Sequence, residues 1–400
     1  MFQNSIISNQ LSLDKFLKEL NFNFYLTNPQ INHLKNIINS MFMDGFNGKI
    51  NDVSKTMSSR HRTSITRFLS KSSWNEQLLF NALKSRVIDL IWSKSKKANK
   101  PIYVIIDDTI SEKTKPSSKA INPIDKCSFH NSHLKGKTVY GHQIVTCLLS
   151  CDGLVLPYDI CIYDKNVMSK IDIAVNIIKS LPAPVSKGYV LCDSWYSCKT
   201  IFTASLQAGF KYIGAVKTNR IIFPKGHEDL GARLNSYALS LDKNAFGLVT
   251  VGNKDYYIYN YVGKLKDMKK VSVVLSYPKE QFHVKGALKA FISLDTDLTD
   301  IEILNIYTDR WVIEPFFRES KRYLGLNGYQ VRSNKSIIRY LLIMLLSYTY
   351  SKLYSSKIFN FNHGFKCIRN NLKKSQVVRI YSAALNGEPI SKIFEALKIA

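Results

Sequence analysis

The chain has 400 residues, enough for two or three domains with a substantial core, and its apolar content of 45% is ordinary for a globular protein. The 56 Lys and Arg residues against 30 Asp and Glu residues give a formal net charge of +26, spread along the whole chain. That composition argues against intrinsic disorder and favours a polyphosphate partner, nucleic acid, contacted over a long footprint.

The first twenty residues mix polar and charged residues with scattered apolar ones, so we expect no signal peptide and a cytoplasmic protein. The longest apolar run, Tyr340–Tyr350, is interrupted by Ser347 and Thr349 and is too short to span a bilayer. We therefore interpret it as a core helix and expect no membrane partner. The seven cysteines include no CxxC pair, which favours free thiols in a reducing compartment.

Residues 1–95 have the pattern of a helical N-terminal domain. Apolar residues recur at helical spacing between Leu13 and Leu20 and again between Ile31 and Met41. The stretch SRHRTSITR at residues 59–67 is strongly basic and is followed by apolar packing residues. It is equally consistent with a helix-turn-helix-like element that reads DNA and with a basic helix that contacts phosphates only. Its candidate DNA-binding residues are Arg60, Arg62 and Arg67.

A short basic linker, Lys94–Lys100, leads into residues 96–220, the first part of a predicted α/β domain with a mixed sheet. The apolar run Ile102–Ile106 ends at Asp107 and Asp108, and a second apolar run ends at Asp193. Both runs have the pattern of buried strands. Acids at strand ends lie at the rim of a sheet, where α/β proteins usually bind ligands.

Residues 221–288 separate Asp193 from the next helical element by more than a single crossover connection requires. They contain short aromatic and β-branched runs between Gly and Lys turns, which predict a β-rich insertion. Lysines between 264 and 270 either follow DNA or form a solvated hairpin face.

Residues 289–335 contain a probable last strand and then a helix that begins after a capping box formed by Thr299 and Glu302. In the segment YTDRWVIEPFFRESK, the polar residues recur at i, i+3, i+7 and i+14, which places a carboxylate between cations on one helical face. Pro315 removes one backbone donor and predicts a kink directly after Glu314. The four residues that share the face are Tyr307, Arg310, Glu314 and Lys321.

The spacing Y-x2-R-x3-E-x6-K, the two acid-bearing strands and the inserted β-region resemble bacterial transposases of the insertion-sequence-4 superfamily, over roughly residues 100–335. The resemblance implies an RNase H-like fold and a DDE catalytic triad that binds metal. It aligns the acid directly before Thr109 with the first metal ligand, so Asp108 is chosen and Asp107 is expected on the other face of the strand. The implied catalytic and metal-binding residues are Asp108, Asp193 and Glu314.

The resemblance also implies a function: binding of the terminal inverted repeats of an insertion sequence, cleavage of DNA and joining of the 3′ ends to target DNA. Three carboxylates are suitable ligands for two Mg²⁺ ions, with Mn²⁺ as a substitute. Tyr307, Arg310 and Lys321 would contact the DNA beside the scissile phosphate. Because two DNA ends must be joined, a homodimer on double-stranded DNA at the nucleoid is expected.

Two alternatives remain open at this stage. A tyrosine recombinase would use Tyr307 as its nucleophile without a metal, although the sequence has no clustered Arg-His-Arg set. A transposase-derived DNA-binding protein that has lost catalysis would retain the basic surface only. The helical pattern of residues 336–400 fits either a dimerisation element or a layer that closes the core.

Overall fold

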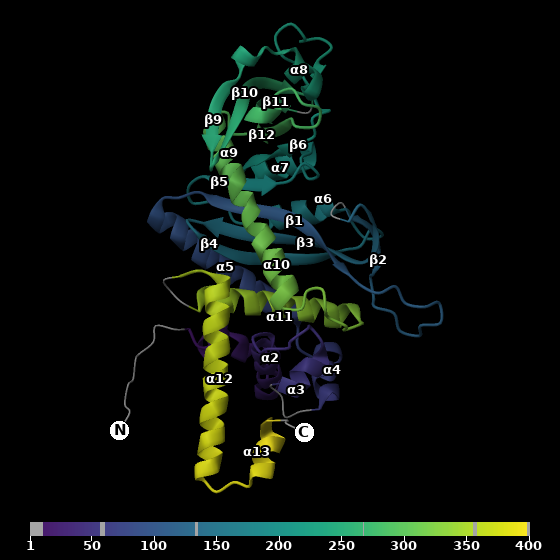
Figure 1. Ribbon diagram of the computed structural model, residues 1–400, viewed down its shortest axis with the longest axis vertical. Helices are drawn as coiled ribbons and strands as arrows, with labels where there is room; N and C mark the ends of the chain where they lie inside the picture. The colour runs from purple at the N-terminus through teal and green to yellow at the C-terminus, as the bar shows by residue number, and fades with distance from the viewer. Residues whose placement is uncertain (1–10, 57–60, 133–134, 267, 355–357, 398–400) are drawn as a thin grey trace.

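The structure is a computed structural model, and it describes residues 11–56, 61–132, 135–266, 268–354 and 358–397. One mixed sheet runs through the upper part of the molecule (Figure 1). Its strands are β1 (Ile102–Glu112), β2 (Ser128–Ser132), β3 (Lys137–Cys151), β4 (Leu154–Tyr163), β5 (Gly188–Cys192), β6 (Lys211–Val216), β7 (Ile221–Ile222), β8 (Ala232–Arg233), β9 (Gly247–Val251), β10 (Lys254–Leu265), β11 (Met268–Pro278) and β12 (Lys289–Ser293).

The centre of the sheet has the order β4-β3-β1-β5-β6. Strand β1 pairs antiparallel with β3 and parallel with β5, which in turn pairs parallel with β6. The segment Ile102–Ile106 is almost entirely buried because helices cover both faces of this part of the sheet. The register places Ile106 opposite Cys192, so Asp107 and Asp193 follow at the same level on neighbouring parallel strands.

The expected β-rich insertion between Asp193 and Glu314 is confirmed, and it extends the central sheet. Strand β12 pairs with β6 on one side and with β11 on the other, and β11 continues to β10. Strand β9 pairs with the start of β10, and the short β7 with its end. The hydrogen-bonded ladder is therefore continuous from the centre of the sheet into the insertion.

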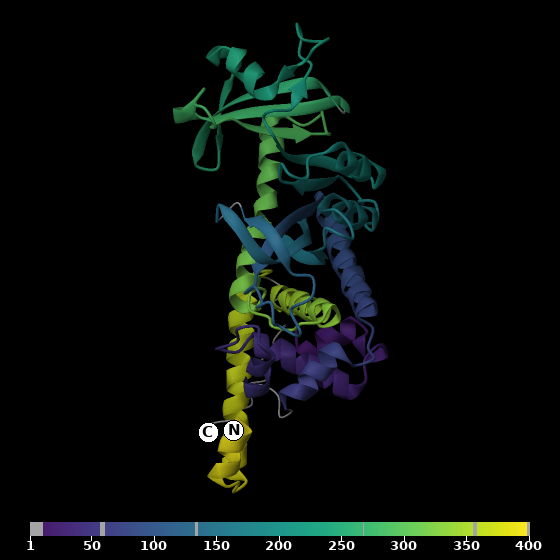
Figure 2. The same ribbon diagram turned by 90° about the vertical axis from the view of Figure 1, so that its right-hand side faces the viewer.

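Helices form a separate layer below the sheet and cover its faces (Figures 1 and 2). Helix α5 packs against β3 and β4, whereas α11 lies between the sheet and the N-terminal helices and is buried along nearly its whole length, as expected for Tyr340–Tyr350. The long α12 and the short α13 project downward from this layer. The α-helices are α1 (Leu13–Glu19), α2 (Asn28–Met41), α3 (Ile50–Thr56), α4 (Arg62–Ser70), α5 (Glu76–Ala98), α6 (Lys170–Lys179), α7 (Lys199–Gln207), α8 (Leu234–Ser240), α9 (Asp300–Thr308), α10 (Ile313–Tyr323), α11 (Asn334–Leu353), α12 (Phe361–Leu385) and α13 (Ile390–Leu397).

The segment expected to form one helix, kinked after Glu314, is divided before that residue instead. The capping box of Thr299 and Glu302 begins α9 as predicted, but a 3-10 turn, η4 (Asp309–Val312), separates α9 from α10. Pro315 therefore lies in the first turn of α10, where a missing backbone donor is tolerated. In Figure 1, α9 and α10 descend together across the sheet from the insertion to the helical layer.

Candidate active site

One face of strand β1 is directed at η4 and α10. The Asp107 carboxylate accepts a hydrogen bond from Arg310 Nη1 at 2.9 Å, and two residues along the strand Lys321 Nζ donates to Thr109 Oγ1 at 2.6 Å. Farther along the same face, Ser111 Oγ donates to the Leu326 carbonyl oxygen. Since alternate residues of a strand share a face, Asp107 belongs to the surface that α10 covers.

Asp108 lies on the opposite face of β1, so the orientation expected for this pair of acids is reversed. Its carboxylate accepts hydrogen bonds from Lys170 Nζ at 2.7 Å, from the Tyr196 hydroxyl at 2.9 Å and from Gln143 Nε2 at 2.5 Å. With a cation and two further donors, this carboxylate is already satisfied by the protein itself.

Asp107 and Asp193 share one electrostatic environment. Burial, and next the negative charge of Asp193, raise the pKa of Asp107 to about 7, while the Arg310 guanidinium opposes the rise. One oxygen of Asp193 accepts the Trp195 backbone N–H at 2.9 Å. Two neighbouring carboxylates, with one guanidinium between them and α10, are a donor set that suits a hard divalent cation, whose charge would relieve their repulsion.

Glu314 is exposed in the first turn of α10, four residues beyond Arg310. In the described part of the chain, no three acidic, His or Cys side chains are grouped closely enough to hold one metal ion. The structure thus brings Asp107 and Asp193 together and leaves Glu314 on the adjacent helix.

Arg310 is the central cation of the site. Its side chain is only 7% exposed, and its Nε atom is buried without a hydrogen-bond partner among the described residues. A buried, unpartnered guanidinium N–H is costly, and an incoming anionic oxygen would satisfy it. Lys321, in contrast, is half-buried, and burial lowers its pKa.

Tyr307 lies beneath Arg310 and packs against Phe291, with 4.8 Å between the ring centroids. Its side chain is buried, and burial raises the pKa of its hydroxyl. A recombinase nucleophile must reach a phosphate and lose its proton readily, so this environment gives no support to the tyrosine recombinase alternative.

Arg62 and Arg67 are exposed on α4, whose opposite side packs against α3 and α11. They lie in the helical layer, away from the acids on β1 (Figure 1). Arg62 and Arg67 therefore form a surface separate from the candidate active site, and Arg60 lies outside the described residues.

Lys170, the partner of Asp108, was not predicted from the sequence. It is the first residue of α6 and lies within the capping box formed by Ser169 and Asp172, and its Nζ lies 3.9 Å from the centre of the Trp195 ring. The capping pattern in the sequence was sufficient to place Lys170 at a helix start. Nothing local indicated its partner 62 residues earlier.

A mixed sheet with paired carboxylates beside a buried arginine fits a metal-dependent enzyme that acts on phosphodiester bonds. Residues 99–350 match the family model of the transposase DDE domain, and the chain belongs to this family. It is therefore a DDE transposase, a class of DNA-cleaving enzymes that use divalent metal ions.

Comparison with solved structures supports the same fold. The chain is similar to the piggyBac transposase in a cryo-EM structure of its synaptic complex with hairpin DNA, with a TM-score of 0.50 and 13% sequence identity. The match covers 94% of this chain and 78% of that chain. The search of curated proteins gave no match. Within the described residues, every helix is too short or too polar to cross a membrane.

Proposed function

We propose that this protein is the transposase of an insertion sequence. In this proposal it binds the terminal inverted repeats, cleaves DNA by two-metal phosphodiester hydrolysis and joins the 3′ ends to target DNA. Its acidic residues are Asp107, Asp193 and Glu314, with Asp107 taking the place that the sequence pattern had given to Asp108. The observation that carries the proposal is the contact of Asp107 with Arg310 beside Asp193 under the catalytic helix.

The chain's own residues have distinct roles in this mechanism. Asp107 and Asp193 would hold Mg²⁺, or Mn²⁺ in its place, and Glu314 would complete the ligands from α10. The metal ions supply charge stabilisation for the attacking and leaving oxygens. Arg310 offers its unpartnered Nε–H to a phosphate oxygen, while Lys321 binds a neighbouring phosphate from the next turns of α10.

Double-stranded DNA is the proposed partner, bound as transposon ends and as target. The net charge of +26 supports a long phosphate footprint, and the piggyBac structure is a synaptic complex with DNA. Arg62 and Arg67 supply a second, exposed basic surface on α4 for the terminal repeat, and Arg60 belongs to the same proposal. We further propose that the protein acts as a homodimer at the bacterial nucleoid, because two ends must be joined in one reaction.

The test is cleavage of a duplex that carries the element's own end and flank, with Mg²⁺, with Mn²⁺ or with a chelator. Wild-type protein should nick the duplex in either metal and leave a free 3′-hydroxyl. Asp107→Asn, Asp193→Asn and Glu314→Gln should each lower the rate by at least a thousandfold without loss of DNA binding. Binding without cleavage in any metal would identify an inactive derivative instead.

A further inference from the structure

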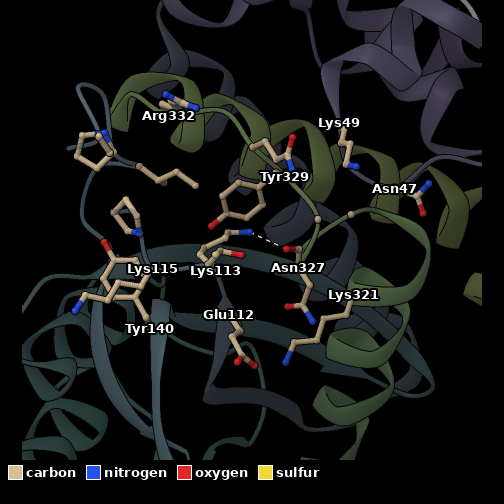
Figure 3. Close-up of a pocket in the computed structure, with 18 of the residues that line it drawn as sticks. Asn47, Lys49, Glu112, Lys113, Lys115, Tyr140, Lys321, Asn327, Tyr329 and Arg332 are labelled. Carbon is tan, nitrogen blue, oxygen red and sulfur yellow. Dashed lines mark hydrogen bonds between the residues drawn. The ribbon is translucent and has the colours of Figure 1, made fainter. Parts of the chain in front are cut away.

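A basic cavity of about 860 Å³ opens beside the C-terminal end of α10 (Figure 3). Three segments form its walls: the loop after α2, the end of β1 with the loop that follows, and the connection from α10 to α11. Among the described residues that line it, Glu112 is the sole carboxylate, and this residue is paired with Lys135. The cations of the lining are Lys49, Lys113, Lys115, Lys321, Arg322 and Arg332.

Among the described residues, these six cations have no carboxylate partner. Lys113 donates to the Asn327 carbonyl oxygen at 2.8 Å and lies 3.4 Å from the centre of the Tyr329 ring, and Arg332 donates to the Asn122 carbonyl oxygen at 2.8 Å. Carbonyl groups and a ring position these side chains without cancelling their charge, so the cavity attracts anions.

The cavity and the candidate active site share Lys321. Lys321 lines the cavity and also donates to Thr109, which is two residues from Asp107 on the same face of β1. Figure 3 shows Lys321 and Lys49 on one side of the opening, with Lys115 and Tyr140 across from them. A DNA strand that leaves the catalytic acids along α10 would reach this cavity next.

We propose that the cavity binds the phosphates of a single-stranded DNA segment that extends from the catalytic acids. The inference rests on the proposed function, since it assigns a path to the DNA of that reaction. A concave basic lining that includes an aromatic ring suits a single strand, whose phosphates follow a charged groove while its bases stack. The half-buried ring of Tyr140 provides a surface on which a base can stack.

The experiment measures the binding of a fluorescent oligonucleotide of eight thymidines to the full chain by anisotropy, across a salt series and without metal. The cavity variant combines Lys49→Gln, Lys115→Gln and Arg322→Gln, because these side chains are exposed and form no hydrogen bond among those described. The control variant removes the same charge elsewhere on the surface with Lys18→Gln, Lys179→Gln and Lys211→Gln, which are exposed as well.

Each phosphate contact contributes about 0.7 to the slope of log K against log salt for single strands, so the cavity variant should lose about 2 from the slope. The control variant should keep the wild-type slope. The same slope in the cavity variant as in wild type would overturn the proposal. So would a loss confined to an eight-base-pair duplex, or competition by micromolar thymidine triphosphate, which would indicate a mononucleotide site.

The binding assay is independent of catalysis. If wild-type protein fails to cleave in any metal, the proposed function fails while the slopes still report on the cavity. If cleavage is metal-dependent but the slope of the cavity variant is unchanged, only the assignment of the cavity is overturned. Thermal unfolding of both triple variants, expected within a few degrees of wild type, shows that they are folded.

Discussion

Asp107 and Asp108 are adjacent in sequence but have opposite surroundings. Asp107 has one cationic partner, Arg310, and a neighbouring carboxylate, whereas Asp108 is saturated by Lys170, Tyr196 and Gln143. A carboxylate already satisfied by the protein is a poor metal ligand, because its donors must be displaced first. Substitution of each acid should therefore have a different effect on metal binding.

Mn²⁺ should raise the melting temperature of wild-type protein, because the ion binds the folded state only. Asp107→Asn should abolish this rise, while Asp108→Asn should retain it and instead lower the stability by about 3 kcal/mol, since Lys170 is left buried without its partner. Differential scanning fluorimetry with and without metal measures both effects, and Asp89→Asn on the exposed side of α5 is the control. A metal response that disappears in Asp108→Asn alone would reverse the assignment.

His142 makes the fold sensitive to acid. Its Nε2–H donates to the Asp125 carbonyl oxygen at 2.7 Å, and its Nδ1 accepts from the Tyr329 hydroxyl at 2.6 Å. Burial lowers the pKa of His142 from 6.5 to about 4. Between these values the unfolded chain binds more protons than the folded one, so stability is present above pH 6.5 and is lost as the pH falls.

Between pH 7 and pH 5 this single group should cost the folded state about 2 kcal/mol. The variant His142→Gln can form the same two hydrogen bonds without titrating, so its free energy of unfolding should decline less over that interval. Urea denaturation at both pH values gives the comparison, with exposed His363→Gln as the matched control. Equal declines in wild type and His142→Gln would show that the imidazole does not carry the effect.

At the scale of elements, α11 holds the N-terminal helices through one buried arginine. Arg339 is fully buried and pairs with Glu76 at 3.0 Å, and its guanidinium also donates to carbonyl oxygens of the last turn of α4 and of the segment that follows it. Those acceptors belong to Phe68, Leu69, Ser72 and Trp74. The orientation of α4, with Arg62 and Arg67 outward, thus depends on α11.

Arg339→Met should lower the free energy of unfolding by about 3 to 5 kcal/mol, because several buried carbonyl groups lose their donors at once. Lys335→Met on the exposed start of the same helix should change it by less than about 0.5 kcal/mol. Chemical denaturation measures both. A small change in the free energy of unfolding of Arg339→Met would mean that water satisfies these carbonyl groups in place of the guanidinium.

The sequence was sufficient to predict several of the elements, though not the division between α9 and α10 or how the elements are oriented. Features that depend on local sequence patterns agree with the structure. They are the strand Ile102–Ile106 with the acid after it, the capping box at Thr299 and the β-rich insertion. Which of Asp107 and Asp108 faces α10 depends on contacts more than 200 residues apart, as in the pair of Asp107 with Arg310. The partners of Asp108 and Arg339 are likewise distant in sequence, so no local pattern indicates them.

At the scale of the whole molecule, the N-terminal helices and the catalytic core contact each other through closely packed backbone atoms. The loop that contains Gly48 crosses the turn from Gly325 to Gly328, and a Cβ atom at Gly328 would lie 1.8 Å from the Asn47 carbonyl oxygen. Glycine is required at position 328 because a Cβ atom there would clash with this carbonyl oxygen. The same close approach forms one wall of the basic cavity.

Gly328→Ala should therefore separate the two layers locally and cost about 1 to 3 kcal/mol, with faster amide exchange in residues 46–49. Gly247→Ala, where the nearest backbone atom is 4.0 Å from the new carbon, should leave both quantities unchanged. Hydrogen exchange read by mass spectrometry distinguishes the outcomes. Unchanged exchange at residues 46–49 in Gly328→Ala would show that the contact is not needed to hold this wall.

The ladder of hydrogen bonds from β6 through β12 and β11 to β10 fixes the distance between the insertion and the centre of the sheet. Hydrogen-bonded strands are spaced by about 4.8 Å, so the three steps place β10 roughly 14 Å from β6, and among the described residues each step is a paired ladder. A sheet extended in this way keeps a constant spacing between its strands. Bending the insertion relative to the centre of the sheet would therefore require the ladder hydrogen bonds between these strands to break.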